Sequence, residues 1–296
     1  MDLSEMILWL KRNYLQDEKS FKAVIMALLN YNKKYQKDIL ALINQLYEDY
    51  AVNGVIDYAT ARKYIDKDAL MAVQSLEDEM ARQNDKYAKY IDELVKKKHV
   101  SRIEYTQALL ITSFESMMQK SEKKITKTFV DNALKNMKKD FKYLSGKDLD
   151  LPEKQIEALA KEVSNLKTPY ASPRVQFTDI RNAYYKYIKT FIPQAFSRRL
   201  TKDQIYEELK RDANKIRNRL NLILTTMGNY QYNYIVQYCM KELDIKEYEY
   251  CAVLDDRTSK ICRELNGQRF KISQAQTGVN FPPMHPNCRS FVVPII

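Results

Sequence analysis

The sequence predicts a mainly α-helical chain, built of long helices with a small α+β module at its C-terminal end. Only 5 of its 296 residues are glycine and 8 are proline, and so few helix breakers leave long stretches free to form helices. Four of the prolines and three of the four cysteines follow residue 250, where the hydrophobic pattern changes from helical steps to the alternation of strands. We therefore expect an N-terminal helical region at 1–99, a central helical region at 100–246 and a compact module at 247–296.

The N-terminal region is expected to hold long helices. Residues 20–50 place apolar side chains at three- and four-residue steps, which gives one apolar stripe. Asn53 and Gly54 are the expected stop, because glycine accepts the left-handed conformation of a helix end. Asp57 is the expected N-cap of the next helix, and helical patterning continues over residues 69–98.

The central region is expected to have a loop near residues 168–173, where two prolines lie within six residues. Before it, residues 101–144 have a helical pattern that ends at Gly146. After it, residues 179–191 are expected to form a short helix. Pro193 should end or kink that helix, because proline lacks the donor of a helical hydrogen bond.

The last long helix is expected to begin at Thr201. Thr201 and Gln204 have the spacing of a capping box, in which each side chain accepts from the main chain of the other residue. An apolar stripe then continues toward Tyr238, and Gly228 is the only interruption that we expect in it.

The chain has a formal net charge of +11, which suggests an acidic partner such as nucleic acid. The densest basic stretch is 181–220, with eleven Lys or Arg against four Asp or Glu. Non-specific contact with DNA phosphates is the functional interpretation, and a solvated helix face is the structural alternative. The candidate residues are Lys186, Lys189, Arg198, Arg199, Lys202, Lys210, Arg211, Lys215, Arg217 and Arg219.

Two classes of protein are excluded by the sequence. It has no apolar run of 18 residues, so we expect no transmembrane helix and no membrane partner. Asp2 and Glu5 precede the first apolar patch, whereas a secretory signal begins with positive charge. Four scattered cysteines do not make a secreted disulfide framework, and we expect reduced thiols.

The module at 247–296 is predicted to contain a short antiparallel sheet. Residues 248–254 alternate between apolar and polar types, and residues 290–295 form a final apolar strand. Asn266 and Gly267 are the residue types of a tight hairpin turn, because both accept positive φ.

A polar turn follows the first predicted strand, with Asp255, Asp256, Arg257 and Thr258 in succession. Asp and Thr side chains bond to nearby main-chain groups, so this turn is expected to cap a helix that starts near Ser259. We also expect an ion pair between Asp255 or Asp256 and Arg289, since arginine offers a planar fork to a carboxylate.

Four potential metal ligands lie in the module: Cys251, Cys262, His285 and Cys288. Two residues separate His285 from Cys288, so one turn can point both side chains at one ion. Zinc in a structural site takes four ligands, and a metal would stabilise a module with so small a core. If Cys251 is not the fourth ligand, Asp255 or Asp256 must be. The structural alternative is that the thiols are small buried apolar groups, with His285 held by a hydrogen bond.

An enzyme is the alternative class of function: a metal-dependent hydrolase or nuclease in the C-terminal segment, with an Asp as general base and His285 as its partner. A zinc-containing nucleic-acid-binding module is a further alternative. The sequence has no glycine-rich phosphate loop, no His-x-Glu pair and no motif of an activated nucleophile. We also expect no effector domain after Pro294, and we expect no catalytic residues.

Three submotifs follow one another in the module: Leu254-Asp-Asp-Arg-Thr-x-x-x-Cys262, then Leu265-Asn-Gly-Gln-Arg-Phe270, then Pro282-Pro-Met-His-Pro-Asn-Cys-Arg289. In this order they resemble the C-terminal signature of the phage Mu F-like head morphogenesis family, which are minor capsid proteins of tailed phages. Residues 200–240 are similar to the helical part before that signature, and the first 190 residues resemble the family by length and helical character. The signature residues are Asp255, Asp256, Arg257, Thr258, Gly267, Pro282, Pro283 and Arg289.

The resemblance implies a structural role in head morphogenesis, without catalysis. It implies a few copies inside the procapsid near the portal, which help assembly and later DNA packaging or ejection. The implied partners are the portal protein and other capsid components, and the implied location is the virion interior, or the bacterial host cytoplasm during assembly. The basic excess is compatible with packaged DNA.

Overall fold

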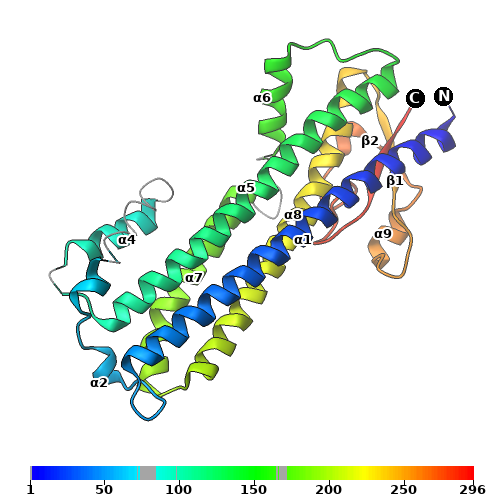
Figure 1. The fold of residues 1–296 in the computed structure, drawn as a ribbon. Helices are drawn as coiled ribbons and strands as arrows, with labels where there is room; N and C mark the ends of the chain where they lie inside the picture. The colour runs from blue at the N-terminus through cyan, green and yellow to red at the C-terminus, as the bar shows by residue number, and fades with distance from the viewer. Residues whose placement is uncertain (1, 72, 74–84, 98, 165, 167–171) are drawn as a thin grey trace. The chain divides into compact units, whose positions relative to one another are not determined.

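A computed structural model describes residues 2–71, 73, 85–97, 99–164, 166 and 172–296 (Figure 1). The chain divides into two compact units. The first unit comprises Met1–Leu28, Glu122–Phe177 and Asn218–Ile296, and the second comprises Leu29–Ser121 and Thr178–Arg217. The regions predicted from the sequence, which divide after residues 99 and 246, are each one continuous segment. Each of the two units instead combines segments that are separate in the sequence.

Long helices supply most of the chain, as predicted, with a small antiparallel sheet near the C-terminus. The structure describes α1 (Leu3–Tyr50), α2 (Tyr58–Ala61), α4 (Asp85–Val95), α5 (Arg102–Ser145), α6 (Glu153–Ser164), α7 (Pro173–Ser197) and α8 (Lys202–Glu242). Much of the helical patterning predicted over 69–98, and most of the loop predicted near 168–173, lies outside the described residues. The mainly α fold class is confirmed.

The predicted ends of these helices are largely confirmed. Asn53, Gly54 and Gly146 follow helix ends with φ of 52°, 76° and 70°, which is the left-handed region where glycine has no Cβ penalty. The Asp57 side chain accepts from the Thr60 main-chain nitrogen at 2.7 Å, so Asp57 is the N-cap of α2. Helix α1 begins well before residue 20, because the apolar stripe extends to its first turns.

The capping box at the start of α8 is also confirmed. The main-chain nitrogen of Thr201 donates to Gln204 Oε1 at 2.9 Å, and the main-chain nitrogen of Gln204 donates to Thr201 Oγ1 at 3.4 Å. Two of the helix's unpaired first donors are therefore satisfied by side chains.

The prediction that residues 179–191 form a short helix ended or kinked by Pro193 was wrong in its boundaries. Helix α7 begins at Pro173 and continues through Pro193 to Ser197. Proline cannot donate to the carbonyl four residues earlier, which is that of Lys189. Gln107 Nε2 donates to this Lys189 oxygen at 3.3 Å. A side chain of α5 thus replaces the bond that Pro193 removes.

Gly228 does not interrupt α8, contrary to prediction, since the helix is continuous from Lys202 to Glu242. The ring of Phe21 occupies the space that a side chain at residue 228 would need. A Cβ at residue 228 would lie 2.2 Å from Cζ of Phe21. The glycine therefore reflects close packing of Phe21 rather than a helix break.

The sheet has three antiparallel strands in the order β2-β1-β3, which confirms the predicted α+β module (Figure 1). Strand β1 (Glu247–Cys251) is central, between β2 (Arg269–Lys271) and β3 (Phe291–Ile295). Helix α9 (Lys260–Leu265) and the 3₁₀ helix η1 (Ile272–Gln274) lie between the strands in sequence. Pro294 lies in the edge strand β3, where a missing donor is tolerated.

The Asn266–Gly267 pair does not form the predicted two-residue hairpin turn. It follows α9 and leads into β2, so the connection from β1 to β2 contains a helix. Gly267 has φ of 82° and its nitrogen donates to the Tyr250 oxygen at 2.8 Å. Asn266 Oδ1 accepts from the Ala252 nitrogen at 2.8 Å. Both residues therefore tie the end of α9 to β1.

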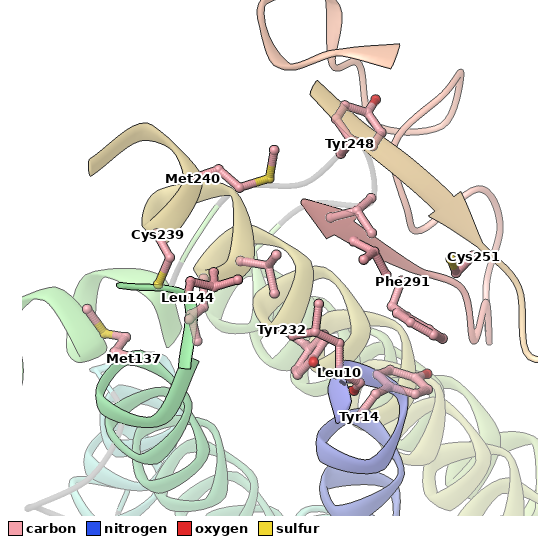
Figure 2. Close-up of a cluster of buried hydrophobic side chains, with 14 of the residues drawn as sticks. Leu10, Tyr14, Met137, Leu144, Tyr232, Cys239, Met240, Tyr248, Cys251 and Phe291 are labelled. Atoms are coloured by element: carbon pink, nitrogen blue, oxygen red, sulfur yellow. Dashed lines mark hydrogen bonds between the residues drawn. The ribbon is translucent and has the colours of Figure 1, made fainter. Parts of the chain in front are cut away.

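The core of the first unit joins the sheet to the helices (Figure 2). Leu10 and Tyr14 of α1, Met137 of α5, Tyr232 of α8 and Phe291 of β3 belong to one buried cluster. Two asparagines of α8 also hold the edge strand. Asn229 Nδ2 donates to the Ser290 oxygen at 2.7 Å, and Asn233 Oδ1 accepts from the Val292 nitrogen at 2.9 Å. The Asn233 contact satisfies a main-chain donor of the edge strand.

The core of the second unit is mainly aliphatic and contains a small aromatic group. Phe114 of α5 stacks on Tyr184 of α7 with ring centroids 3.9 Å apart, and the hydroxyls of Tyr35 and Tyr184 are hydrogen-bonded to each other. A buried ion pair lies in the same unit, where Arg181 Nε donates to Glu115 Oε2 at 3.0 Å.

Candidate functional site

Three of the predicted metal ligands come together in the C-terminal module. Cys262, His285 and Cys288 each offer one ligand atom, and these atoms all lie within 4.8 Å of one another. Cys262 Sγ is 3.4 Å from His285 Nε2 and 3.8 Å from Cys288 Sγ. The two sulfurs are free thiols, and 3.8 Å is far beyond a disulfide bond of about 2.05 Å.

Helix α9 positions Cys262 through the polar turn before it. Ser259 is the N-cap, and its hydroxyl accepts from the Cys262 nitrogen at 3.3 Å. The Thr258 hydroxyl accepts from the Asp255 nitrogen at 2.8 Å and donates to the Val253 oxygen at 2.6 Å. The predicted capped turn is therefore confirmed, and it directs the first turn of α9 toward the site.

A tight turn positions His285 and Cys288. The Cys288 nitrogen donates to the His285 oxygen at 3.1 Å, and Asn287 has a positive φ of 61°, which asparagine tolerates better than most residues. Helix α8 anchors this turn. The Thr225 hydroxyl donates to Asn287 Oδ1 at 2.6 Å, and the Thr226 hydroxyl accepts from the Asn287 nitrogen at 3.0 Å.

Hydrogen bonds orient the potential ligand atoms themselves. His285 Nδ1 lies 2.9 Å from the Pro286 carbonyl oxygen. A carbonyl can only accept, so Nδ1 holds the proton and the lone pair of Nε2 faces the sulfurs. Tyr250 Oη donates to Cys262 Sγ at 3.3 Å. The bond between the thiols lowers the pKa of Cys262, and the same bond together with burial raises the pKa of Cys288.

Cys251 does not join the other three ligands. Successive side chains of a strand point to opposite faces: Tyr250 packs in the small cluster with Cys262 and Cys288, whereas Cys251 belongs to the main cluster of the first unit with Phe291 (Figure 2). Burial raises the pKa of the Cys251 thiol to about 12, as expected of an inert apolar thiol. Among the described residues, no carboxylate joins the group either.

The predicted ion pair with Arg289 is formed by Asp255. Arg289 donates to Asp255 Oδ1, and Asp255 Oδ1 also accepts from the Arg257 nitrogen at 2.9 Å. The bond from Arg289 is the main reason that the pKa of Asp255 falls to about 2. Asp256 is exposed, and Arg257 lies 3.6 Å from Asp255 Oδ2. The pair connects the turn before α9 to the residue after Cys288.

The other signature residues complete the same module. Pro282 and Pro283 are buried and joined by a cis peptide bond just before Met284. Gly267 has the positive φ described above. All three submotifs, which are separated in sequence, thus surround the Cys262, His285 and Cys288 group.

The ten predicted DNA-contact residues lie on α7, α8 and the turn between them. Two are already paired on their own helix: Lys210 with Glu207 at 2.9 Å, and Arg211 with Glu208 at 3.0 Å. The Lys189 ammonium lies 4.4 Å from the Tyr90 ring centroid. Arg198, Arg199 and Lys202 are exposed at the α7–α8 turn. Lys186, Lys189, Arg211, Lys215 and Arg219 are also exposed, whereas Lys210 and Arg217 are half-buried.

Residues 186–293 match the family model described as phage Mu protein F like protein. The match covers somewhat over a third of the chain and includes the three submotifs and the basic stretch from Lys186 onward. The resemblance predicted from the sequence is thereby confirmed over this segment. None of the curated proteins and none of the solved structures that were compared matches the chain.

The structure also bears on the predicted lack of a membrane span. Among the helices it describes, none combines the length and the apolar character needed to cross a bilayer.

Several residues that build the site were not predicted. Tyr250, Thr225, Thr226, Asn229 and Asn233 carry no motif of their own, and they matter because the fold places them against the signature segment. The strand alternation at 248–254 could have predicted that Cys251 lies apart from the other ligands. If Tyr250 faces the ligands, the adjacent Cys251 must face away.

Proposed function

Since residues 186–293 match the phage Mu protein F like family, we propose that this chain is a structural protein of phage head morphogenesis. In this proposal it is a minor capsid protein that assembles in the procapsid near the portal. Its partners are the portal protein and other capsid components, and it stays in the virion interior. Its role is to bind and position other head components, without a chemical reaction.

The observation that carries the proposal is the agreement between the family match and the module's geometry. The three submotifs within the match form one compact module. Hydrogen bonds with Thr225, Asn229 and Asn233 hold this module against α8. Those contacts serve to hold the module on a long helix. A module fixed in this way suits a protein that docks between other subunits.

Assembly with the head components tests this proposal. The full chain carrying an affinity tag is co-expressed with the portal, scaffold and major capsid proteins of the same phage, and particles are separated by sedimentation. We expect the chain in the procapsid fraction, together with the portal, when the portal is present. A chain that stays at the top of the gradient in the presence of all partners would contradict the proposal.

Contact with packaged DNA is the second part of the proposal. It is supported by the exposed Arg198, Arg199 and Lys202 at the α7–α8 turn and by the net charge of +11. Such contact releases counterions, so the affinity for a duplex should fall with salt, with a slope of roughly 0.9 per phosphate contact on logarithmic axes.

Two matched variants distinguish contact with DNA from the alternative, in which the basic helix face contacts only solvent. The triple change R198A/R199A/K202A should lower the salt slope by about 2–3. The control K210A/R211A should change it less, because these two cations are already paired with Glu207 and Glu208. No mobility shift at low salt would refute the DNA contact, and equal effects of both variants would refute its assignment to the α7–α8 turn. Cleavage of the DNA in the presence of Mg²⁺ or Zn²⁺ would favour the nuclease alternative.

A further inference from the structure

We infer that Cys262, His285 and Cys288 bind one Zn²⁺ ion with three protein ligands, and that the fourth position takes an exchangeable ligand from solvent. This differs from a closed four-ligand site in which Cys251 completes the set. The inference rests on the spacing of the ligand atoms, on the groups that orient them, and on a hollow beside them.

The spacing of the ligand atoms fits tetrahedral zinc. Zn–S bonds of about 2.3 Å and Zn–N bonds of about 2.05 Å at the tetrahedral angle place two sulfurs about 3.8 Å apart, and a sulfur and a nitrogen about 3.6 Å apart. The distances in the structure are 3.8 Å between Cys262 Sγ and Cys288 Sγ, and 3.4 Å between Cys262 Sγ and His285 Nε2. Two of the three separations therefore match one tetrahedral ion, and the third, between Cys288 Sγ and His285 Nε2, is within 4.8 Å.

Surrounding groups orient these atoms in the way that metal sites require. A ligating imidazole usually donates its other N–H to a carbonyl or carboxylate, which fixes the tautomer. His285 does so through the Pro286 oxygen at 2.9 Å. The Tyr250 hydroxyl donates to Cys262 Sγ at 3.3 Å, which would stabilise a thiolate ligand. Two thiolates and an imidazole are a soft donor set that zinc prefers over magnesium or calcium.

The described part of the chain leaves the fourth position to an outside ligand. Among the described residues, no further Cys, His, Asp or Glu joins the group, and Asp255 is engaged by Arg289. A small hollow of about 10 Å³ borders Cys262 and His285, which is roughly the room that one water molecule needs. Three protein ligands with one solvent ligand is the arrangement of open zinc sites.

A second, larger hollow lies next to this one. It has a volume of about 390 Å³ and lies beside the 285–288 turn. Arg257, His285, Asn287 and Arg289 line both hollows, so the two are adjacent. Arg257 and Arg289 share one carboxylate, Asp255, and Glu18 and Lys22 of opposite charge also line the larger hollow. Two guanidinium groups against one carboxylate leave a net positive charge beside the site, which favours an anionic ligand such as hydroxide or a carboxylate. The fourth ligand is therefore exchangeable.

Metal content of the full chain is the first test. Protein purified with added Zn²⁺ and then dialysed should hold one zinc per chain by elemental analysis. Cys262→Ser, Cys288→Ser and His285→Asn should each lose most of it. Cys251→Ser is the matched control, because it removes a buried thiol from the same module and should keep the zinc. Loss of zinc in C251S equal to that in C288S would overturn the three-ligand assignment.

Cobalt substitution of the unmutated chain tests the open position and does not depend on how variants fold. The visible bands of bound Co²⁺ should indicate tetrahedral coordination with thiolate ligands. Titration with imidazole or a small thiol should shift these bands, because the added ligand replaces solvent. Bands that stay unchanged at saturating imidazole would show a closed site. A chain that binds neither Zn²⁺ nor Co²⁺ would overturn the inference while leaving the proposed role in head assembly intact.

Discussion

Arg289 donates to Asp255 Oδ1, and this ion pair connects the two segments that carry the candidate metal ligands. Asp255 belongs to the turn that precedes α9 and Cys262, whereas Arg289 directly follows Cys288. The half-buried carboxylate also accepts from the Arg257 nitrogen at 2.9 Å. The pair therefore holds the two segments together directly.

Substitution of this carboxylate should weaken the module and its metal binding together. Because the pKa of Asp255 is lowered to about 2, chiefly by the bond from Arg289, the pair stabilises the fold above the unfolded-state pKa of about 3.9. That stabilisation is lost as the pH falls from about 4 through 2.

The measurement is urea unfolding of D255N and of the unmutated chain at pH 5 and pH 3. We expect D255N to lower the midpoint at pH 5 and to have a smaller effect at pH 3. Asp256→Asn, at the exposed next residue, should change stability by less than about 0.5 kcal/mol. Equal effects of D255N and D256N would contradict the role of the ion pair.

Asp140 is a buried carboxyl group in the first unit that should make stability depend on pH near neutrality. It lies in α5, accepts from Asn13 Nδ2 at 3.2 Å, and is fully buried. Burial, and next the nearby Asp17 carboxylate, raise the pKa of Asp140 to about 8, against the lowering influence of Lys139 and Lys135. The folded state therefore holds a proton that the unfolded state releases above about pH 4.

The free energy of unfolding should therefore decrease between about pH 4 and pH 8, by at most about 1.4 kcal/mol per pH unit from this group. Asp140→Asn keeps the shape and removes the proton equilibrium, so its stability should depend less on pH and exceed that of the unmutated chain at pH 8. Asp131→Asn, an exposed change on the same helix, is the control. A pH dependence identical in D140N and the unmutated chain would refute this assignment.

The contact between Gln107 and Lys189 predicts a coupling between Gln107 and Pro193. Gln107→Ala in the unmutated chain leaves the Lys189 oxygen without the donor it now has, and this should cost about 1–3 kcal/mol. In P193A the main-chain nitrogen of residue 193 can donate to the same oxygen. In the P193A background, Gln107→Ala should therefore cost about 1 kcal/mol less than it does in the unmutated chain. Its other effects, including the loss of the Tyr90 contact, occur in both backgrounds and cancel in the double-mutant cycle.

Unfolding free energies of the four proteins, the unmutated chain, Q107A, P193A and the double variant, give this coupling directly. A coupling energy within about 0.3 kcal/mol of zero would show that Gln107 does not compensate for Pro193.

Gly228→Ala should destabilise the first unit although alanine is the better helix former. The propensity gain is about 1 kcal/mol, but the new Cβ would lie 2.2 Å from Phe21 Cζ. Phe21 is buried and packs edge-on against Phe129 with centroids 6.5 Å apart, so the ring cannot move without loss. Overpacking costs about 1–3 kcal/mol, and thermal unfolding should show a lower midpoint. In the F21L background the clash is relieved, so G228A should raise the unfolding midpoint instead of lowering it. A midpoint of G228A/F21L no higher than that of F21L would contradict this explanation.

Residue periodicity predicted the long helices because their stability depends on apolar stripes and end signals that are local in sequence. The stops at Gly54 and Gly146, the Asp57 cap and the Thr201 capping box all follow from one or two neighbouring residues. The sequence alone mispredicts the effects of Pro193 and Gly228, because the residues that explain them, Gln107 and Phe21, are distant in the sequence.

The candidate site, too, was predictable only where the signal is local in the sequence. Ligand type and the spacing of His285 and Cys288 indicated a shared position, and the structure brings Cys262 to them. Cys251 matches the ligand set by residue type alone, whereas the pleat of β1 turns it to the other face of the sheet. The anchoring threonines and asparagines of α8 have no sequence signal, since only the packing of the module on that helix gives them partners.

The protein composition of purified phage heads tests the proposal that this chain is a head component. Particles from the phage or induced prophage that encodes the chain are purified by density gradient, separated into heads and tails, and analysed by quantitative mass spectrometry. We expect peptides of this chain in the head fraction at a few copies per portal. Their absence from both procapsids and mature heads, with the portal readily detected, would contradict it.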